Sequence, residues 1–107
     1  MKVTKNIKFE FLGSEYEVFL KLEEYAMGGL AVQAVTTEGE PWSTVSVKLP
    51  GYATAEDEIF VDTNNGAQLA QKLVQEGILI PTGEIGYSGF CSYPKCKVAL
   101  DKFNVER

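Results

Sequence analysis

The chain has 107 residues, a formal net charge of −5 at pH 7 and 45% hydrophobic residues, a composition typical of one globular domain spanning residues 1–107. The acidic balance argues against direct nucleic-acid binding, which needs a positive surface. No apolar run is long enough to span a membrane, and charges interrupt every apolar run in residues 1–20, so we expect a cytoplasmic protein without a signal peptide.

Alternation of apolar and polar side chains predicts two strands near the start of the chain. They cover residues 5–12 and about 15–25. The apolar face of the second strand holds Tyr16, Val18, Leu20 and Leu22. The short connection at Gly13 and Ser14 indicates a hairpin, because glycine accepts the positive φ that tight turns require.

Two further strands are predicted next. Residues 30–37 are apolar on both faces, which indicates a central strand. After a turn at 38–41, residues 42–49 show the clearest alternation in the sequence, and Pro50 ends this strand because it cannot donate to a ladder. One face holds Ser43, Val45, Val47 and Leu49, and the other holds Trp42, Thr44, Ser46 and Lys48. Together the four strands predict an antiparallel meander.

One helix is predicted, and it follows a short fifth strand at 59–61. Polar side chains at 62–65 offer N-caps, and the helix runs from about Asn65 or Gly66 to Glu76, with Gly77 where a helix commonly ends. Its apolar face holds Leu69, Leu73 and Val74. The sequence therefore predicts an α+β fold in two layers, in which a meander sheet of four to six antiparallel strands packs on a single α-helix.

The C-terminal part of the chain is predicted to be less regular. Residues 84–94 are rich in Gly, Ser and Tyr, and we interpret them mainly as an ordered loop. A final strand is predicted at 96–100, with Cys96, Val98 and Leu100 facing inward.

The chemical inventory argues against catalysis. The sequence contains no histidine, which removes the commonest general base and every Ser–His or Cys–His nucleophile. It also lacks the glycine-rich nucleotide-binding motifs. We therefore expect neither an enzyme nor a cofactor. We interpret Cys91 and Cys96 as free thiols, with a disulfide or a metal site shared with a second subunit as the alternatives.

Seven residues are candidates for contact with a protein partner. The acidic candidates are Glu17, Glu23 and Glu40, and the aromatic candidates are Trp42, Tyr87, Phe90 and Tyr93. Residues 10–62 carry a local net charge of −9, which suits a basic partner or serves solubility alone. Aromatic side chains in a Gly/Ser-rich segment give contact area at low entropic cost; the alternative is that they cover the open end of a small core.

Several short motifs carry a resemblance to a known family. They are GEPW at 39–42, VSVKLP at 45–50, FVDTNN at 60–65, PTG at 81–83 and SGFCSYP at 88–94. Over about residues 16–100 the chain resembles a family of small bacterial proteins classed only as a domain of unknown function, carried on plasmids, conjugative elements and prophages of Firmicutes and other gut bacteria. The resemblance implies an accessory gene of a mobile element and assigns no catalytic residue.

These observations favour a small, acidic, non-enzymatic protein-binding module from a mobile genetic element. By analogy with other small acidic proteins of such elements, the hypothesis extends to an inhibitor of a host defence nuclease, of the anti-CRISPR type. Its acidic sheet face would dock on a basic, nucleic-acid-binding surface of a host enzyme, with segment 87–93 as the anchor. The alternatives are a homo-oligomeric structural or regulatory module and a thiol-dependent enzyme or metal protein.

Overall fold

The computed structural model describes every residue of the chain, 1–107, and confirms the α+β class. Its elements are β1 (Lys2–Val3), β2 (Ile7–Phe11), β3 (Ser14–Glu24), β4 (Leu30–Thr36), β5 (Pro41–Thr44), β6 (Ser46–Val47), β7 (Glu58–Val61), α1 (Thr63–Gln75), β8 (Leu79–Ser88), β9 (Cys91–Val98), the 3₁₀ helix η1 (Leu100–Lys102) and β10 (Val105–Glu106). None of the helices is long and apolar enough to cross a membrane.

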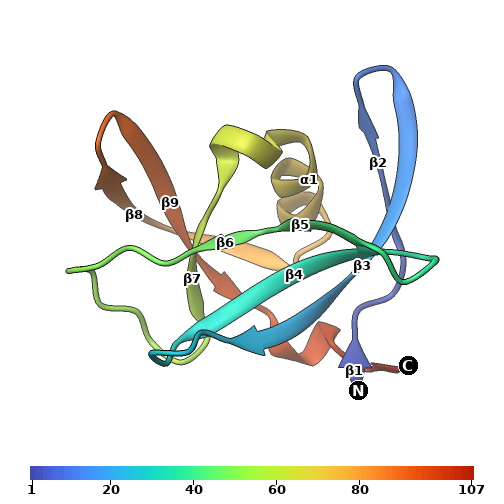
Figure 1. Cartoon of the computed structure of the whole chain (residues 1–107), viewed down its shortest axis with the longest axis horizontal. Helices are drawn as coiled ribbons and strands as arrows, with labels where there is room; N and C mark the ends of the chain where they lie inside the picture. The colour runs from blue at the N-terminus through green and yellow to red at the C-terminus, as the bar shows by residue number, and fades with distance from the viewer.

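The first sheet contains the predicted meander. Strands β2, β3, β4 and β5 pair antiparallel in chain order, as Figure 1 shows. The short strand β1 pairs with the far end of β3, and β10 pairs with β1. The apolar face predicted for β3 is confirmed, because Val18 and Leu20 are fully buried and Tyr16 and Leu22 pack against the same core.

The prediction of a single sheet is wrong, because the strands divide into two sheets. The second sheet has the order β6-β7-β9-β8. The chain crosses between the sheets at Val45, whose N–H donates to the carbonyl of Val32 and whose carbonyl accepts from the N–H of Asp62. The strand predicted at 42–49 is therefore split into β5 and β6. Its alternation stops at the crossing, where Val45 and Ser46 are both buried, since one residue there serves both sheets.

Helix α1 begins at Thr63, earlier than the predicted start at Asn65 or Gly66, and it ends before Gly77 as predicted. Asp62 is the N-cap, and its carboxylate accepts a hydrogen bond of 3.2 Å from the N–H of Asn65. Gly77 has a φ of +73°, and the N–H of Ile78 donates to the carbonyl of Leu73. The helix therefore ends in a Schellman motif, which satisfies its last carbonyl groups.

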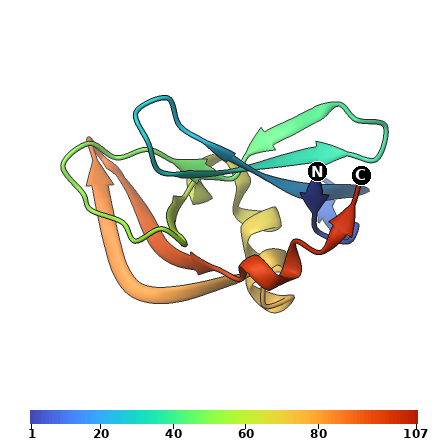
Figure 2. The same cartoon turned by 90° about the horizontal axis from the view of Figure 1, so that it is seen from below.

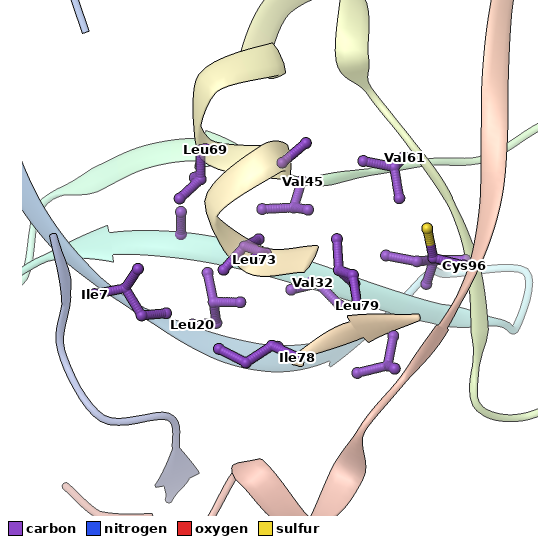
Figure 3. Close-up of a cluster of buried hydrophobic side chains, with 14 of the residues drawn as sticks. Ile7, Leu20, Val32, Val45, Val61, Leu69, Leu73, Ile78, Leu79 and Cys96 are labelled. Atoms are coloured by element: carbon purple, nitrogen blue, oxygen red, sulfur yellow. The ribbon is translucent and has the colours of Figure 1, made fainter. Parts of the chain in front are cut away.

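The helix fills the space between the two sheets. Figure 2 shows α1 beside the first sheet, with β8 and β9 curving past it. A single cluster of buried residues joins α1 to both sheets. Figure 3 shows part of it, with Leu69 and Leu73 on the helix, Leu20 and Val32 on the first sheet, and Val61 and Cys96 on the second. Val74, predicted on the buried face, is instead 41% exposed, because it lies about 100° around the helix from Leu73.

The two ends of the chain lie side by side. The N-terminal amine is 2.7 Å from Oε1 of Glu106, and the guanidinium of Arg107 stacks 3.9 Å from the ring centroid of Phe19. The last long strand, β9, ends before Leu100. That residue was predicted to face inward but is exposed on η1, because the chain leaves the sheet there.

Candidate protein-binding surface

The segment at 84–94, predicted mainly as an ordered loop, is a β-hairpin made by β8 and β9. Its turn is Gly89 and Phe90, between the paired residues Ser88 and Cys91. Gly89 has a φ of +60°, which suits the first central position of a type II′ turn. Glycines and prolines interrupt the alternation of both strands, so the sequence pattern does not reveal the hairpin.

One face of this hairpin packs against the segment that follows β6. A Cβ added to Gly86 would lie 2.6 Å from Cδ1 of Leu49 and 2.8 Å from Cε1 of Phe60. Tyr52 stacks edge-on against the same Phe60 ring, with 5.4 Å between ring centroids. Glycine at position 86 therefore permits the close packing that holds the middle of the hairpin in place.

The other face and the turn carry apolar side chains that remain exposed. Ile85 and Tyr87 lie on the face opposite Gly86 and are 50% and 60% exposed, and Phe90 at the turn is fully exposed. Large apolar side chains exposed on one ordered element make it a candidate surface for protein contact. We call Ile85, Tyr87 and Phe90 the apolar hairpin surface.

An apolar groove continues this surface toward the helix, through Pro94, which pairs with Ile85. The groove has a volume of 240 Å³. Its lining residues are Val61, Thr63, Ala67, Ala70, Gln71, Val74, Leu79, Pro81, Pro94 and Cys96. None of them is charged. Burial raises the pKa of the Cys96 thiol, so this group stays protonated at neutral pH and behaves as an apolar contact.

Tyr93 and Cys91 face the packed side of the hairpin and not the apolar hairpin surface. They pair with Gly86 and Ser88, so their side chains share the face that Gly86 occupies. Desolvation raises the pKa of Tyr93, and the nearby Cys91 and Asp62 raise it further. Tyr93 is half-buried and therefore supports the hairpin more than it offers contact area.

Both cysteines are free thiols, Cys91 partly exposed and Cys96 buried. Both lie on β9, where a separation of five residues places their Cα atoms about 16 Å apart along the strand. A disulfide requires Cα atoms within about 7 Å, so these two thiols cannot pair with each other in this fold.

Trp42 belongs to a different aromatic cluster. Its ring lies 4.6 Å from Tyr16, 5.7 Å from Phe9 and 6.1 Å from Phe11, measured between centroids. The cluster packs against the main core on the face of the first sheet that meets the helix. Trp42 therefore lies apart from Tyr87 and Phe90, and the Trp42 ring packs against the core.

The three acidic candidates lie on the first sheet and its turns. Glu17 accepts a hydrogen bond of 2.9 Å from Asn6, and Glu23 pairs with Lys21 at 3.2 Å. Glu17 and Glu23 share the outer face of β3 with Lys21 between them, so this face carries charges of both signs. Glu40 is exposed in the turn between β4 and β5.

The fold and this surface define a small α+β domain that presents an apolar hairpin to solvent. The chain belongs to the family described as a domain of unknown function (DUF4313), whose model matches residues 19–106. The matched residues include the whole of the β8–β9 hairpin and leave out β2. No curated protein and no solved structure matches the chain.

Sequence reasoning identified two of the three residues of the apolar hairpin surface and missed Ile85 and the groove. A signal for Ile85 was present, because Ile85 and Tyr87 flank Gly86 at a spacing of two, as strand neighbours on one face do. The groove left no such signal, since its lining comes from three separate segments of the chain.

Proposed function

We propose that this chain is a non-enzymatic protein-binding module that engages its partner through the apolar hairpin surface and the adjoining groove. The observation that carries the proposal is the exposure of Ile85, Tyr87 and Phe90 on a hairpin whose opposite face is packed. A pre-ordered aromatic anchor loses little entropy on binding, and central aromatic residues dominate most protein interfaces.

The charge of the chain supports a basic partner. The net charge is −5, with a local net charge of −9 over residues 10–62, while the groove itself is uncharged. Complementary charge speeds encounter and excludes acidic competitors, while the apolar contact supplies most of the affinity. The partner that fits is a cytoplasmic protein with a basic rim around an apolar recess.

The proposal extends to a mobile-element protein that inhibits a host defence nuclease of the CRISPR type. A nucleic-acid-binding channel has the basic rim that this chain requires. The support is the acidic charge, the small size and the resemblance of motifs such as SGFCSYP at 88–94 to proteins of mobile elements.

The test begins with capture of partners from a nuclease-treated host lysate and continues with the purified partner in titration calorimetry. We expect Phe90→Ala and Tyr87→Ala each to weaken binding about 10- to 100-fold, because each removes an exposed anchor. Leu12→Ala is the matched control, since Leu12 is an exposed apolar residue at the tip of the other hairpin. Affinity that is unchanged in Phe90→Ala and Tyr87→Ala, or equally reduced in Leu12→Ala, would sink the proposal.

The charge contribution is tested separately by salt. Binding to a basic partner is expected to weaken as ionic strength rises, because screening removes the attraction. Affinity that rises with salt would remove the basic rim from the proposal and leave only the apolar contact.

A further inference from the structure

The distal half of β8 is an outer strand that the fold leaves open. The remaining outer strands are protected by the usual devices: β6 and β10 have two residues each, β5 starts with Pro41, and β2 alternates the charged Lys8 and Glu10 along its exposed face. By contrast, Ile85–Ser88 carries no charge and no proline. The side chains of this stretch therefore do not oppose pairing with another strand.

The hydrogen-bonding groups of Ile85 and Tyr87 point away from β9. The N–H of Tyr87 donates to the hydroxyl of Tyr52 at 3.1 Å and not to the neighbouring strand. Pro94, opposite Ile85, has no N–H to donate. Because antiparallel pairs alternate between bonded and non-bonded, Gly86 and Ser88 bond to β9 while Ile85 and Tyr87 face outward.

We infer that β8 pairs antiparallel with β8 of a second copy of this chain. The register that uses both outward residues places Ile85 of one copy opposite Tyr87 of the other, with Gly86 at the two-fold axis. It joins an aromatic and a β-branched side chain on each side of the axis, a favourable cross-strand pair. Glu84 then lies opposite Ser88, so no like charges meet across the junction.

Tyr52 controls access to this edge. In the single chain its hydroxyl accepts a hydrogen bond from the N–H of Tyr87, and its ring lies edge-on against Phe60. Tyr52 is itself 42% exposed, so it can turn away when a second strand arrives. In the single chain the hydroxyl satisfies a backbone group that would otherwise be open, and pairing exchanges that hydrogen bond for one between the two copies.

This pairing goes beyond the proposed function and leaves the binding faces open. A two-fold axis perpendicular to the sheet keeps both grooves on one side, so two apolar hairpin surfaces become continuous. Each copy carries a net charge of −5, so the copies repel and the dimer is expected to be weak and to strengthen with salt. The opposite salt dependence expected for the basic partner keeps the two proposals distinguishable.

Sedimentation velocity from micromolar to millimolar protein tests the inference. We expect wild type to form a weak dimer that Tyr52→Phe tightens about 3- to 10-fold, because this change frees the N–H of Tyr87 while keeping the ring on Phe60. Ile85→Pro removes an outward N–H and is expected to weaken the dimer at least about 10-fold relative to Ile85→Ala, which keeps that N–H.

Three results would overturn the inference: monomers at every concentration for both wild type and Tyr52→Phe, equal dissociation constants for Ile85→Pro and Ile85→Ala, or a dimer that weakens with salt. The comparison of wild type with Tyr52→Phe decides the matter if Ile85→Pro does not fold.

Phe90→Ala is expected to leave the dimer unchanged, because Phe90 lies in the turn beyond the paired residues. Partner affinity measured in Phe90→Ala therefore tests the proposed function without testing the dimer.

Discussion

The β2–β3 and β8–β9 hairpins share a backbone plan but differ in how far their aromatic side chains are exposed. Both have a two-residue turn with a large exposed apolar residue, Leu12 in one and Phe90 in the other, and both rise beside α1 in Figure 1. In the first hairpin the aromatic residues pack on each other and on Trp42. In the second, Tyr87 remains exposed along with the turn.

The spaces between each hairpin and the helix differ in the same way. Beside β2–β3 lies a groove of 390 Å³ lined almost wholly by polar side chains, among them Lys8, Glu10 and Gln71. Beside β8–β9 lies the uncharged groove of 240 Å³. The difference shows that aromatic content alone does not leave the side chains of a hairpin exposed. Side-chain packing decides it: Trp42 of β5 covers Phe9 and Tyr16 of the first hairpin, whereas Tyr87 of the second remains 60% exposed.

The largest expected effect separates a packed aromatic residue from an exposed one. Trp42→Ala is expected to lower the free energy of unfolding by about 2–3 kcal/mol, because it opens the cluster with Phe9 and Tyr16. Phe90→Ala is expected to change it by less than about 0.5 kcal/mol, because the side chain is fully exposed. Urea denaturation of the two variants checks this contrast, and equal losses would erase the distinction between the hairpins.

The next effect concerns the packed face of β8–β9. Gly86→Ala is expected to destabilise the fold by about 1–3 kcal/mol, because the new methyl group overlaps Leu49 and Phe60. Ser88→Ala, on the same face but nearer the turn, is the matched control and is expected to be nearly neutral. Thermal unfolding measures both, and a stable Gly86→Ala protein would show that this face is loosely packed.

A smaller effect of opposite sign is expected at the tip of β2–β3. Leu12 has a φ of +52°, a left-handed conformation that strains residues with a Cβ, and Gly13 follows it at +81°. Leu12→Asn creates the Asn–Gly pair favoured in this turn and is expected to stabilise the fold by about 0.5–1 kcal/mol. A lower urea midpoint for this variant would instead assign the Leu12 side chain a structural contact.

The last prediction concerns reactivity along β9. Iodoacetamide is expected to modify Cys91 in the folded protein and to leave Cys96 intact, because burial shields Cys96 and raises its pKa. Mass spectrometry locates the label, and unfolding in urea is the control in which both thiols react. Equal labelling of both thiols under native conditions would show that the base of the hairpin opens readily.

The elements that the sequence predicted correctly are those whose signals are local. Alternation identified β2, β3 and β4, and Asp62 and Gly77 marked the ends of α1 through their roles as caps. The β8–β9 hairpin was missed because Gly83, Gly86 and Pro81 interrupt its pattern. The crossing at Val45 was missed because a residue that bonds to two sheets looks like any other strand residue.

The sequence by itself determined the α+β class, the helix and the meander, and it offered Trp42, Tyr87, Phe90 and Tyr93 as aromatic candidates without separating exposed from packed ones. The class, the helix and the meander follow from backbone periodicity and capping, which act within a few residues. Only the tertiary structure decided that Trp42 packs in a cluster and that Ile85 joins an open strand edge. The physical reason is that burial depends on which segment lies alongside, and those neighbours are distant in the chain.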